Sequence, residues 1–283
     1  MNFFPNINLD IMNHQFNNIK YKDFDLVIGG GGLRGYYHIG SLYILKDLEK
    51  QKKISIRQII GTSSGAIASV NYACNINFNK WLESYNEIKN SMLNGLDLHM
   101  ATITVLKYKL PSNAHILCNQ QNVKIVVAKF NWWPFGFTET IFDNFESFDH
   151  LINCLSAAIN IPIYTSNNFK GIMMNNNRYY DGFFCRLTPI IQNNDMPQLV
   201  IKTAYVLYPK FVTLEPKDSY INLLAMRGFL ETKKFLTIDT NINKVIEWIE
   251  PYNKNDLAEQ VKTNYLFYVI PLIFFIGANY INK

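Results

Sequence analysis

The chain has 283 residues, a formal net charge of +5, 48% hydrophobic residues and 17% charged residues. This length suits one or two domains, and the apolar content is high enough for a buried core, which excludes an intrinsically disordered chain. The lysines and arginines are scattered along the sequence and form no basic run. We therefore expect no nucleic-acid partner.

The four cysteines lie far apart, form no Cys-x-x-Cys pair and do not combine with the five histidines at the spacing of zinc ligands. We therefore expect no metal site, and free thiols that are typical of a reducing, intracellular compartment. The N-terminal residues lack the basic and then apolar pattern of a secretory signal, which also indicates an intracellular protein.

The first 75 residues contain two units in which a strand is followed by a glycine turn and a helix. Residues 24–29 form an apolar run that ends in glycines, and the apolar spacing over 35–50 is helical. The β-branched run at 54–60 ends in Gly-Thr-Ser-Ser-Gly, and an apolar helical pattern follows over 66–73. Two such units in series favour a parallel sheet that helices cover on both faces.

The rest of the chain alternates between helical and strand patterns. The apolar spacing predicts helices over 78–106, 147–159, 220–235 and 242–249. Runs of β-branched and aromatic residues predict strands over 123–130, 137–142, 178–180 and 199–207, and the second of these would pair with the first. Because no linker or repeat divides the chain, we expect one α/β domain with a C-terminal appendage.

The C-terminal segment 265–281 carries no charged side chain, and 266–276 is almost wholly apolar. Its length is near the shortest that crosses a bilayer as a helix, and Pro271 lies within it. Two interpretations stay open: a short membrane anchor or interfacial segment, or a terminal strand or helix packed on the core. In the first case the protein would be membrane-associated through this segment.

Residues 29–35 read Gly-Gly-Gly-Gly-Leu-Arg-Gly and separate the first predicted strand from the first predicted helix. Gly30, Gly32 and Gly35 fit the G-x-G-x-x-G pattern of dinucleotide-binding proteins. However, the second predicted strand does not end in the acidic residue that would bind a ribose. The backbone N–H groups of such a loop can equally converge on a tetrahedral oxyanion. We favour the oxyanion interpretation, and a nucleotide-dependent Rossmann oxidoreductase is the remote alternative.

The second strand–helix junction matches the G-x-S-x-G pattern of a nucleophile elbow, with Gly61 and Gly65 flanking the central Ser63. The sharp turn of an elbow holds the central hydroxyl above the end of the sheet. Ser64 has the same side chain but does not occupy the central position. Ser63 is therefore the candidate nucleophile.

A serine nucleophile needs a base, and the histidines offer none in a suitable place. In the usual α/β-hydrolase order the histidine comes last, yet His150 is the last histidine here. We interpret His99, His115 and His150 as surface or structural residues. A Ser-His-Asp triad is therefore hard to build from this chain.

Four blocks of sequence, in this order and spacing, resemble the patatin-like phospholipase family. They are Gly-Gly-Gly-Leu-Arg-Gly at 30–35, Gly-Thr-Ser-Ser-Gly at 61–65, Ser-Ala-Ala-Ile at 156–159 leading to Pro162, and Asp181-Gly182. The resemblance covers about residues 24–207. It implies a three-layer α/β/α fold with a mostly parallel central sheet.

The resemblance also implies a lipid acyl hydrolase with a Ser-Asp dyad and no cofactor. Ser63 would attack a fatty-acyl ester of a membrane phospholipid or neutral lipid at a membrane surface, and Asp181 would act as the base. The N–H groups of Gly31 and Gly32 would hold the oxyanion. Arg34 would fix the loop or approach a headgroup phosphate.

One departure from the family pattern concerns the base. The family usually has Ala or Gly after Asp181-Gly182, where this chain has Phe183. This departure motivates the alternative of a catalytically weak or silent lipid-binding relative.

The expected domain division is a catalytic domain at 20–210, a helical part at 211–264 packed on it, and the apolar tail at 265–281.

Overall fold

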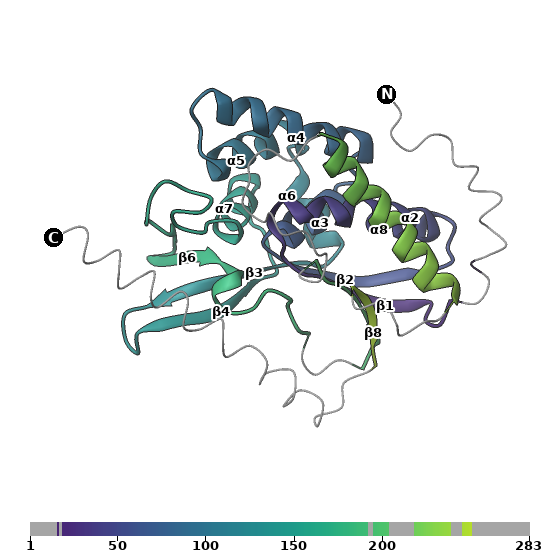
Figure 1. The fold of residues 1–283 in the computed structure, drawn as a ribbon. Coiled ribbons are helices and arrows are strands. Elements are labelled where there is room, and N and C mark those ends of the chain that lie inside the picture. Colours follow the sequence, from purple (N-terminus) through teal and green to yellow (C-terminus); the bar gives the residue numbers. More distant parts are fainter. Residues whose placement is uncertain (1–15, 17–18, 192–194, 204–217, 239–244, 251–283) are drawn as a thin grey trace.

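The computed structural model describes residues 16, 19–191, 195–203, 218–238 and 245–250, which form an eight-stranded sheet with helices over it (Figure 1). The strands are β1 (Asp23–Ile28), β2 (Ser55–Thr62), β3 (Val123–Asn131), β4 (Gly136–Phe142), β5 (Ile172–Met174), β6 (Asn177–Asp181), β7 (Gln198–Ile201) and β8 (Ile246–Ile249). The helices are η2 (Gly32–Gly35), α2 (Tyr36–Lys50), α3 (Ser64–Ala73), α4 (Phe78–Leu93), α5 (Leu98–Lys109), α6 (Ala114–Gln120), α7 (Phe148–Ala158), η3 (Gly182–Phe184) and α8 (Asp218–Ile238).

The centre of the sheet is parallel and its margins are antiparallel. The strand order is β5-β6-β3-β2-β1-β7-β8, and β4 pairs separately with β3. Strands β3, β2, β1 and β7 are parallel to their neighbours in this group, whereas β4, β5, β6 and β8 are joined by antiparallel pairs. The predicted α/β fold with central parallel strands is confirmed, and the architecture is consistent with the α/β/α arrangement of the resembling family.

Alternation along β1 explains how the sheet is covered. Phe24, Leu26 and Ile28 belong to the main core beneath α2 and α8, whereas Val27 faces the other side. There it forms a smaller cluster with residues of β2, β3 and β7, against which Ile191 and residue 249 of β8 pack. Such near-continuous apolar runs are typical of parallel strands that are buried on both faces.

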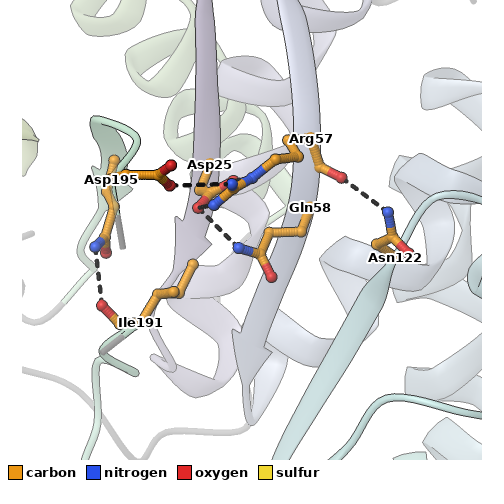
Figure 2. Close-up of polar contacts among 7 residues, drawn as sticks. Asp25, Arg57, Gln58, Asn122, Ile191 and Asp195 are labelled. Atoms are coloured by element: carbon orange, nitrogen blue, oxygen red, sulfur yellow. Dashed lines mark hydrogen bonds and ion pairs between the residues drawn. The ribbon is translucent and has the colours of Figure 1, made fainter. Parts of the chain in front are cut away.

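An ion-pair network closes the end of the sheet where β1 and β2 begin (Figure 2). Asp25 is fully buried, and its carboxylate accepts two hydrogen bonds from Arg57, at 2.9 and 2.8 Å, and one from Gln58 at 2.8 Å. A buried carboxylate needs such partners because its desolvation is unfavourable. This network therefore ties β1 to β2 at the sheet end opposite to their glycine turns.

Most predicted elements are present, with three differences. The predicted helix at 78–106 is two helices, because the chain turns at Gly95, whose φ of +95° favours glycine. The predicted strand at 199–207 ends at residue 201 among the described residues. The predicted helix at 242–249 is wrong, since 246–249 forms β8, whose backbone hydrogen bonds to β7 outweigh the helical spacing.

The prediction of a C-terminal membrane anchor is also corrected. Within the ranges that the structure describes, no helix is both long and apolar enough to cross a bilayer. Residues 265–281 themselves lie outside the described residues. The anchor, and membrane association through it, are not retained. The division at 210 and 264 stays a prediction, although α8 packs on α2 and β8 joins the sheet.

Candidate active site

Ser63 lies at the sharp turn between β2 and α3. Its φ of +55° and ψ of −127° are sparsely populated for a residue with a side chain, and such strain is characteristic of a nucleophile elbow. Gly61 and Gly65 make the turn possible, because a Cβ on Gly61 would collide with the backbone of Gly65, and one on Gly65 with the carbonyl oxygen of Ile28. The glycines flanking Ser63 are therefore required by close backbone packing.

The register of β3 brings Asp181 to the same point of the sheet. Because β4 pairs with β3 over 125–131, both β2 and β6 must occupy the opposite edge of β3. On that edge Val126 pairs with Thr62, the last residue of β2, and Val127 pairs with Asp181, the last residue of β6. The C-terminal ends of two strands that run in opposite directions thus meet. Ser63 comes directly after the end of β2, and Asp181 is the last residue of β6.

Contacts around this junction confirm that the two ends touch. A Cβ added to Gly182 would lie 2.9 Å from Thr62 Cγ2 and 2.8 Å from the Val126 carbonyl oxygen. The N–H of Asp181 donates to the Asn160 carbonyl oxygen at 3.0 Å. Asn160 follows the Ser-Ala-Ala-Ile block, so this block fixes the backbone of Asp181.

The carboxylate of Asp181 is fully buried, and only part of it is hydrogen-bonded. Its Oδ1 accepts from the N–H of Phe183 at 2.8 Å, whereas Oδ2 has no hydrogen-bond partner among the described residues. Burial raises the pKa of Asp181 to about 7, and the Phe183 N–H and the Ser63 hydroxyl each lower it. The Ser63 hydroxyl is therefore one of the two polar groups that act on this carboxylate.

Two amides of the glycine loop donate to none of the described residues. The N–H of Gly30 donates to the Leu187 carbonyl oxygen at 2.8 Å, and that of Arg34 donates to the Gly31 carbonyl oxygen at 3.1 Å. No hydrogen bond from the N–H of Gly31 or Gly32 to a described residue is found. Gly32 begins the short helix η2, where the first N–H groups have no acceptor within the helix. These two amides can receive an anion.

Thr203, beyond the end of β7, braces this loop. Its hydroxyl donates to the Gly30 carbonyl oxygen, and its own carbonyl accepts from Arg34 Nη1 at 3.4 Å. A Cβ on Gly31 would collide with the Thr203 side chain. Arg34 therefore contacts the residue that braces the loop, and its two predicted roles stay predictions.

The loop packs directly on the turn at Ser63 and Ser64. A Cβ on Gly30 would lie 2.9 Å from Ser63 Cβ, and one on Gly35 would lie 2.6 Å from Ser64 Cβ. The predicted residues Gly30, Gly35 and Ser63 are thus brought together, and Asp181 ends the strand that meets β2 along the same edge of β3. The sequence did not single out Asn160, Leu187 or Thr203, which support them.

The histidines take other places. His99 Nε2 lies 3.0 Å from both the carbonyl oxygen and the hydroxyl of Ser156, and His150 Nδ1 accepts from a backbone N–H at 3.3 Å. His38 is fully buried on α2, and burial lowers its pKa to about 3, so its ring is neutral at pH 7. None of these rings hydrogen-bonds to Ser63 or Asp181 in the described residues.

Comparison with known proteins places the chain in a family. The patatin-like phospholipase model matches residues 26–192. The chain is 27% identical over 170 residues to human patatin-like phospholipase domain-containing protein 5, covering 56% of this chain and 37% of that protein. It is 23% identical over 170 residues to human omega-hydroxyceramide transacylase, covering 56% of this chain and 30% of that protein.

The chain thus spans well under half the length of either relative. The family model, in contrast, covers more than half of this chain and includes the glycine loop, the turn at Ser63 and Asp181-Gly182. By this match, the chain belongs to the patatin-like phospholipase family.

Proposed function

We propose that the chain hydrolyses fatty-acyl esters of lipids, with Ser63 as nucleophile and Asp181 as general base. The observation that supports this most is the end-to-end meeting of β2 and β6 along one edge of β3, which brings the strained serine and the buried carboxylate together. The family match supports a lipid ester as the substrate, and phospholipids or neutral lipids are the candidates.

In the first half of the reaction, Ser63 Oγ attacks the ester carbonyl carbon and Asp181 takes the hydroxyl proton. The carbonyl π electrons move to the oxygen, which becomes an oxyanion. When the tetrahedral intermediate collapses, the bond to the alcohol portion of the lipid breaks, and Asp181 returns the proton to that leaving oxygen. The products are an acyl-serine and a lipid alcohol.

In the second half, Asp181 takes a proton from water, and the oxygen of that water attacks the acyl-serine. Collapse of the second intermediate releases the fatty acid and returns a proton to Ser63. A lipid hydroxyl could replace the water, in which case the acyl group would be transferred and no fatty acid would appear. One of the relatives is named as a transacylase, so the product analysis below includes acyl transfer.

The N–H groups of Gly31 and Gly32 are the proposed oxyanion donors. Neither N–H group donates a hydrogen bond to a described residue, and the contacts of Gly30 and Thr203 hold the loop against Ser63. Donors of this kind stabilise the transition state by about 3 kcal/mol each, because they are oriented before charge develops. Backbone donors on a braced loop fit that requirement.

The alternative of a silent lipid-binding protein rests on Phe183. Its N–H donates to Asp181 Oδ1, a contact that any residue other than proline could make at this position. Its ring lies 5.9 Å from that of Phe184 at an interplanar angle of 70°, so it packs against this neighbouring ring. We therefore favour an active base.

Fatty-acid release from phospholipid and triacylglycerol panels tests the proposal. Ser63→Ala and Asp181→Asn should each abolish release and transfer while the protein keeps its cooperative unfolding transition. Ser64→Ala is the matched control, because it removes a neighbouring hydroxyl that makes no hydrogen bond among the described residues, and it should retain most activity. Full activity in Ser63→Ala would refute the proposed chemistry.

A further inference from the structure

The loop between β3 and β4 exposes three aromatic side chains at the tip of a hairpin. Residues 132–135, which we call the tryptophan loop, connect Asn131 to Gly136, the last pair of the ladder. Trp132 is 73% exposed, Trp133 is 92% exposed and Phe135 is 50% exposed. Large apolar side chains that gather in this way on a soluble surface indicate an interaction site.

The tryptophan loop is supported from beneath. Phe130 is buried, and its ring contacts those of Trp132 and Phe135 edge to face, with centroids 5.0 and 5.4 Å apart. Phe130 also lies 5.6 Å from the ring of Phe137 on β4. These contacts hold two of the exposed rings in place on the strand end, so their exposure is a feature of the fold.

Cationic and polar side chains lie beside the tryptophan loop. A hollow of about 340 Å³ is lined by Lys129, Phe130, Asn131, Trp132, Trp133, Met173, Asn176, Asn177 and Arg178. Two of these lining residues, Lys129 and Arg178, are charged, and both are basic. A surface that combines aromatic rings, amides and positive charge complements the phosphate level of a lipid bilayer, where tryptophan is enriched and basic side chains meet anionic headgroups.

The hairpin projects on the side of the sheet that carries the elbow. Thr62, the last residue of β2, pairs with Val126, and β3 continues in the same direction to Asn131. At about 3.3 Å per residue this extension reaches about 17 Å past the strand end at which Ser63 lies. In Figure 1 the β3–β4 hairpin extends away from the helices at the margin of the sheet.

We propose that the tryptophan loop inserts into the interface of a phospholipid bilayer, with Lys129 and Arg178 at the level of the phosphates. This docking would place the end of the sheet that carries Ser63 toward the lipid surface. The biological purpose of this docking rests on the proposed function, but the docking itself does not, since binding to a bilayer does not require the ester to be cleaved. The experiment therefore measures binding separately from chemistry.

The two exposed tryptophans serve as intrinsic probes. The chain has four tryptophans; Trp81 is buried and Trp248 packs against the core. The full chain carrying Ser63→Ala, which leaves vesicle lipids intact, is mixed with phosphatidylcholine–phosphatidylserine vesicles that contain brominated acyl chains. We expect a blue shift and bromine quenching of the tryptophan emission. Replacing Trp132 and Trp133 with Phe in the same background should remove the quenching.

Vesicle binding by co-sedimentation gives the second readout. The double variant Trp132→Ala and Trp133→Ala should bind on the order of tenfold or more weakly, because the apolar area that enters the bilayer is lost. Lys129→Gln should reduce the dependence of binding on phosphatidylserine and on salt. Tyr108→Ala on α5 is the matched control: Tyr108 is an aromatic residue that is 85% exposed, and its loss should leave binding unchanged.

The outcomes separate the possible occupants of this surface. Unchanged vesicle binding in the double tryptophan variant would overturn the proposal. So would an absence of quenching together with a concentration-dependent dimer that the same variant abolishes, since the loop would then contact a second copy of the chain. Failure of the proposed function would show differently, as vesicle binding through the loop with no lipid product from the unsubstituted protein.

Discussion

Replacing Asp181 with Asn should abolish activity and, at the same time, remove the loss of stability that the unsubstituted protein undergoes as the pH rises. Burial raises the pKa of Asp181 from 3.8 to about 7, so the folded protein holds a proton that the unfolded chain loses between these pH values. Stability therefore falls as the pH rises through this window and is fully present below the lower value. This difference in pKa between the folded and the unfolded chain lowers the free energy of unfolding by about 4 kcal/mol at pH 7 and above, compared with its value at low pH.

Asn cannot ionise, so Asp181→Asn avoids this loss. Its side-chain oxygen can still accept from the Phe183 N–H, which is 2.8 Å from Oδ1 in the unsubstituted protein. Its amide group is a new buried donor, whose effect shifts the whole stability curve without changing its dependence on pH. The slope with pH, rather than the value at one pH, is therefore the quantity to measure.

Urea unfolding of both proteins between about pH 5 and pH 8 provides this slope. The stability of Asp181→Asn relative to the unsubstituted protein should rise over this range and level off above about pH 7. Asp25→Asn is the matched control, since Asp25 is equally buried but is paired with Arg57 (Figure 2); this change should destabilise the protein. A difference between Asp181→Asn and the unsubstituted protein that is independent of pH would refute the reasoning.

One pH profile and two further substitutions have defined expected results. The kcat/KM for a soluble short-chain ester should fall about tenfold per unit as the pH drops below the Asp181 pKa of about 7; a profile flat to pH 5 would exclude Asp181 as the base. Gly31→Ala should lower kcat on the order of a hundredfold, because the new Cβ would collide with Thr203 and move an oxyanion donor; an unchanged kcat would remove the loop from the mechanism. Arg57→Met should reduce the free energy of unfolding by about 3 kcal/mol, since it leaves the Asp25 carboxylate buried without its cation, and Arg57→Lys in the same urea titration should recover part of the loss.

The parts of the fold that local sequence determines were predictable. Glycine turns at 29–35 and 61–65 between apolar runs indicated two parallel strands with helices after them, and both are present. Ser147 was expected to begin a helix, and its hydroxyl accepts the N–H of His150 as an N-cap. These features depend on residues within one or two turns of each other.

The features that depend on pairing between distant segments were not predictable in the same way. Residues 246–249 have a spacing that a helix also allows, and only the edge of β7 makes them a strand. The order of strands in the sheet decides that Thr203 braces the glycine loop and that Asn160 holds Asp181. No local pattern encodes this order. The pairing of Ser63 with Asp181 was expected from the family resemblance alone, since a two-residue Asp-Gly pattern is common in turns.

The location of the reactive serine tests the central claim most directly. The full chain would be treated with a fluorophosphonate, digested and mapped by mass spectrometry, with Ser63→Ala, Ser64→Ala and Asp181→Asn treated in parallel. The dyad predicts one modified residue, Ser63, whose labelling persists in Ser64→Ala, is lost in Ser63→Ala and is strongly slowed in Asp181→Asn. Modification of Ser64 instead, or labelling of Ser63 at an undiminished rate in Asp181→Asn, would contradict a serine activated by this carboxylate.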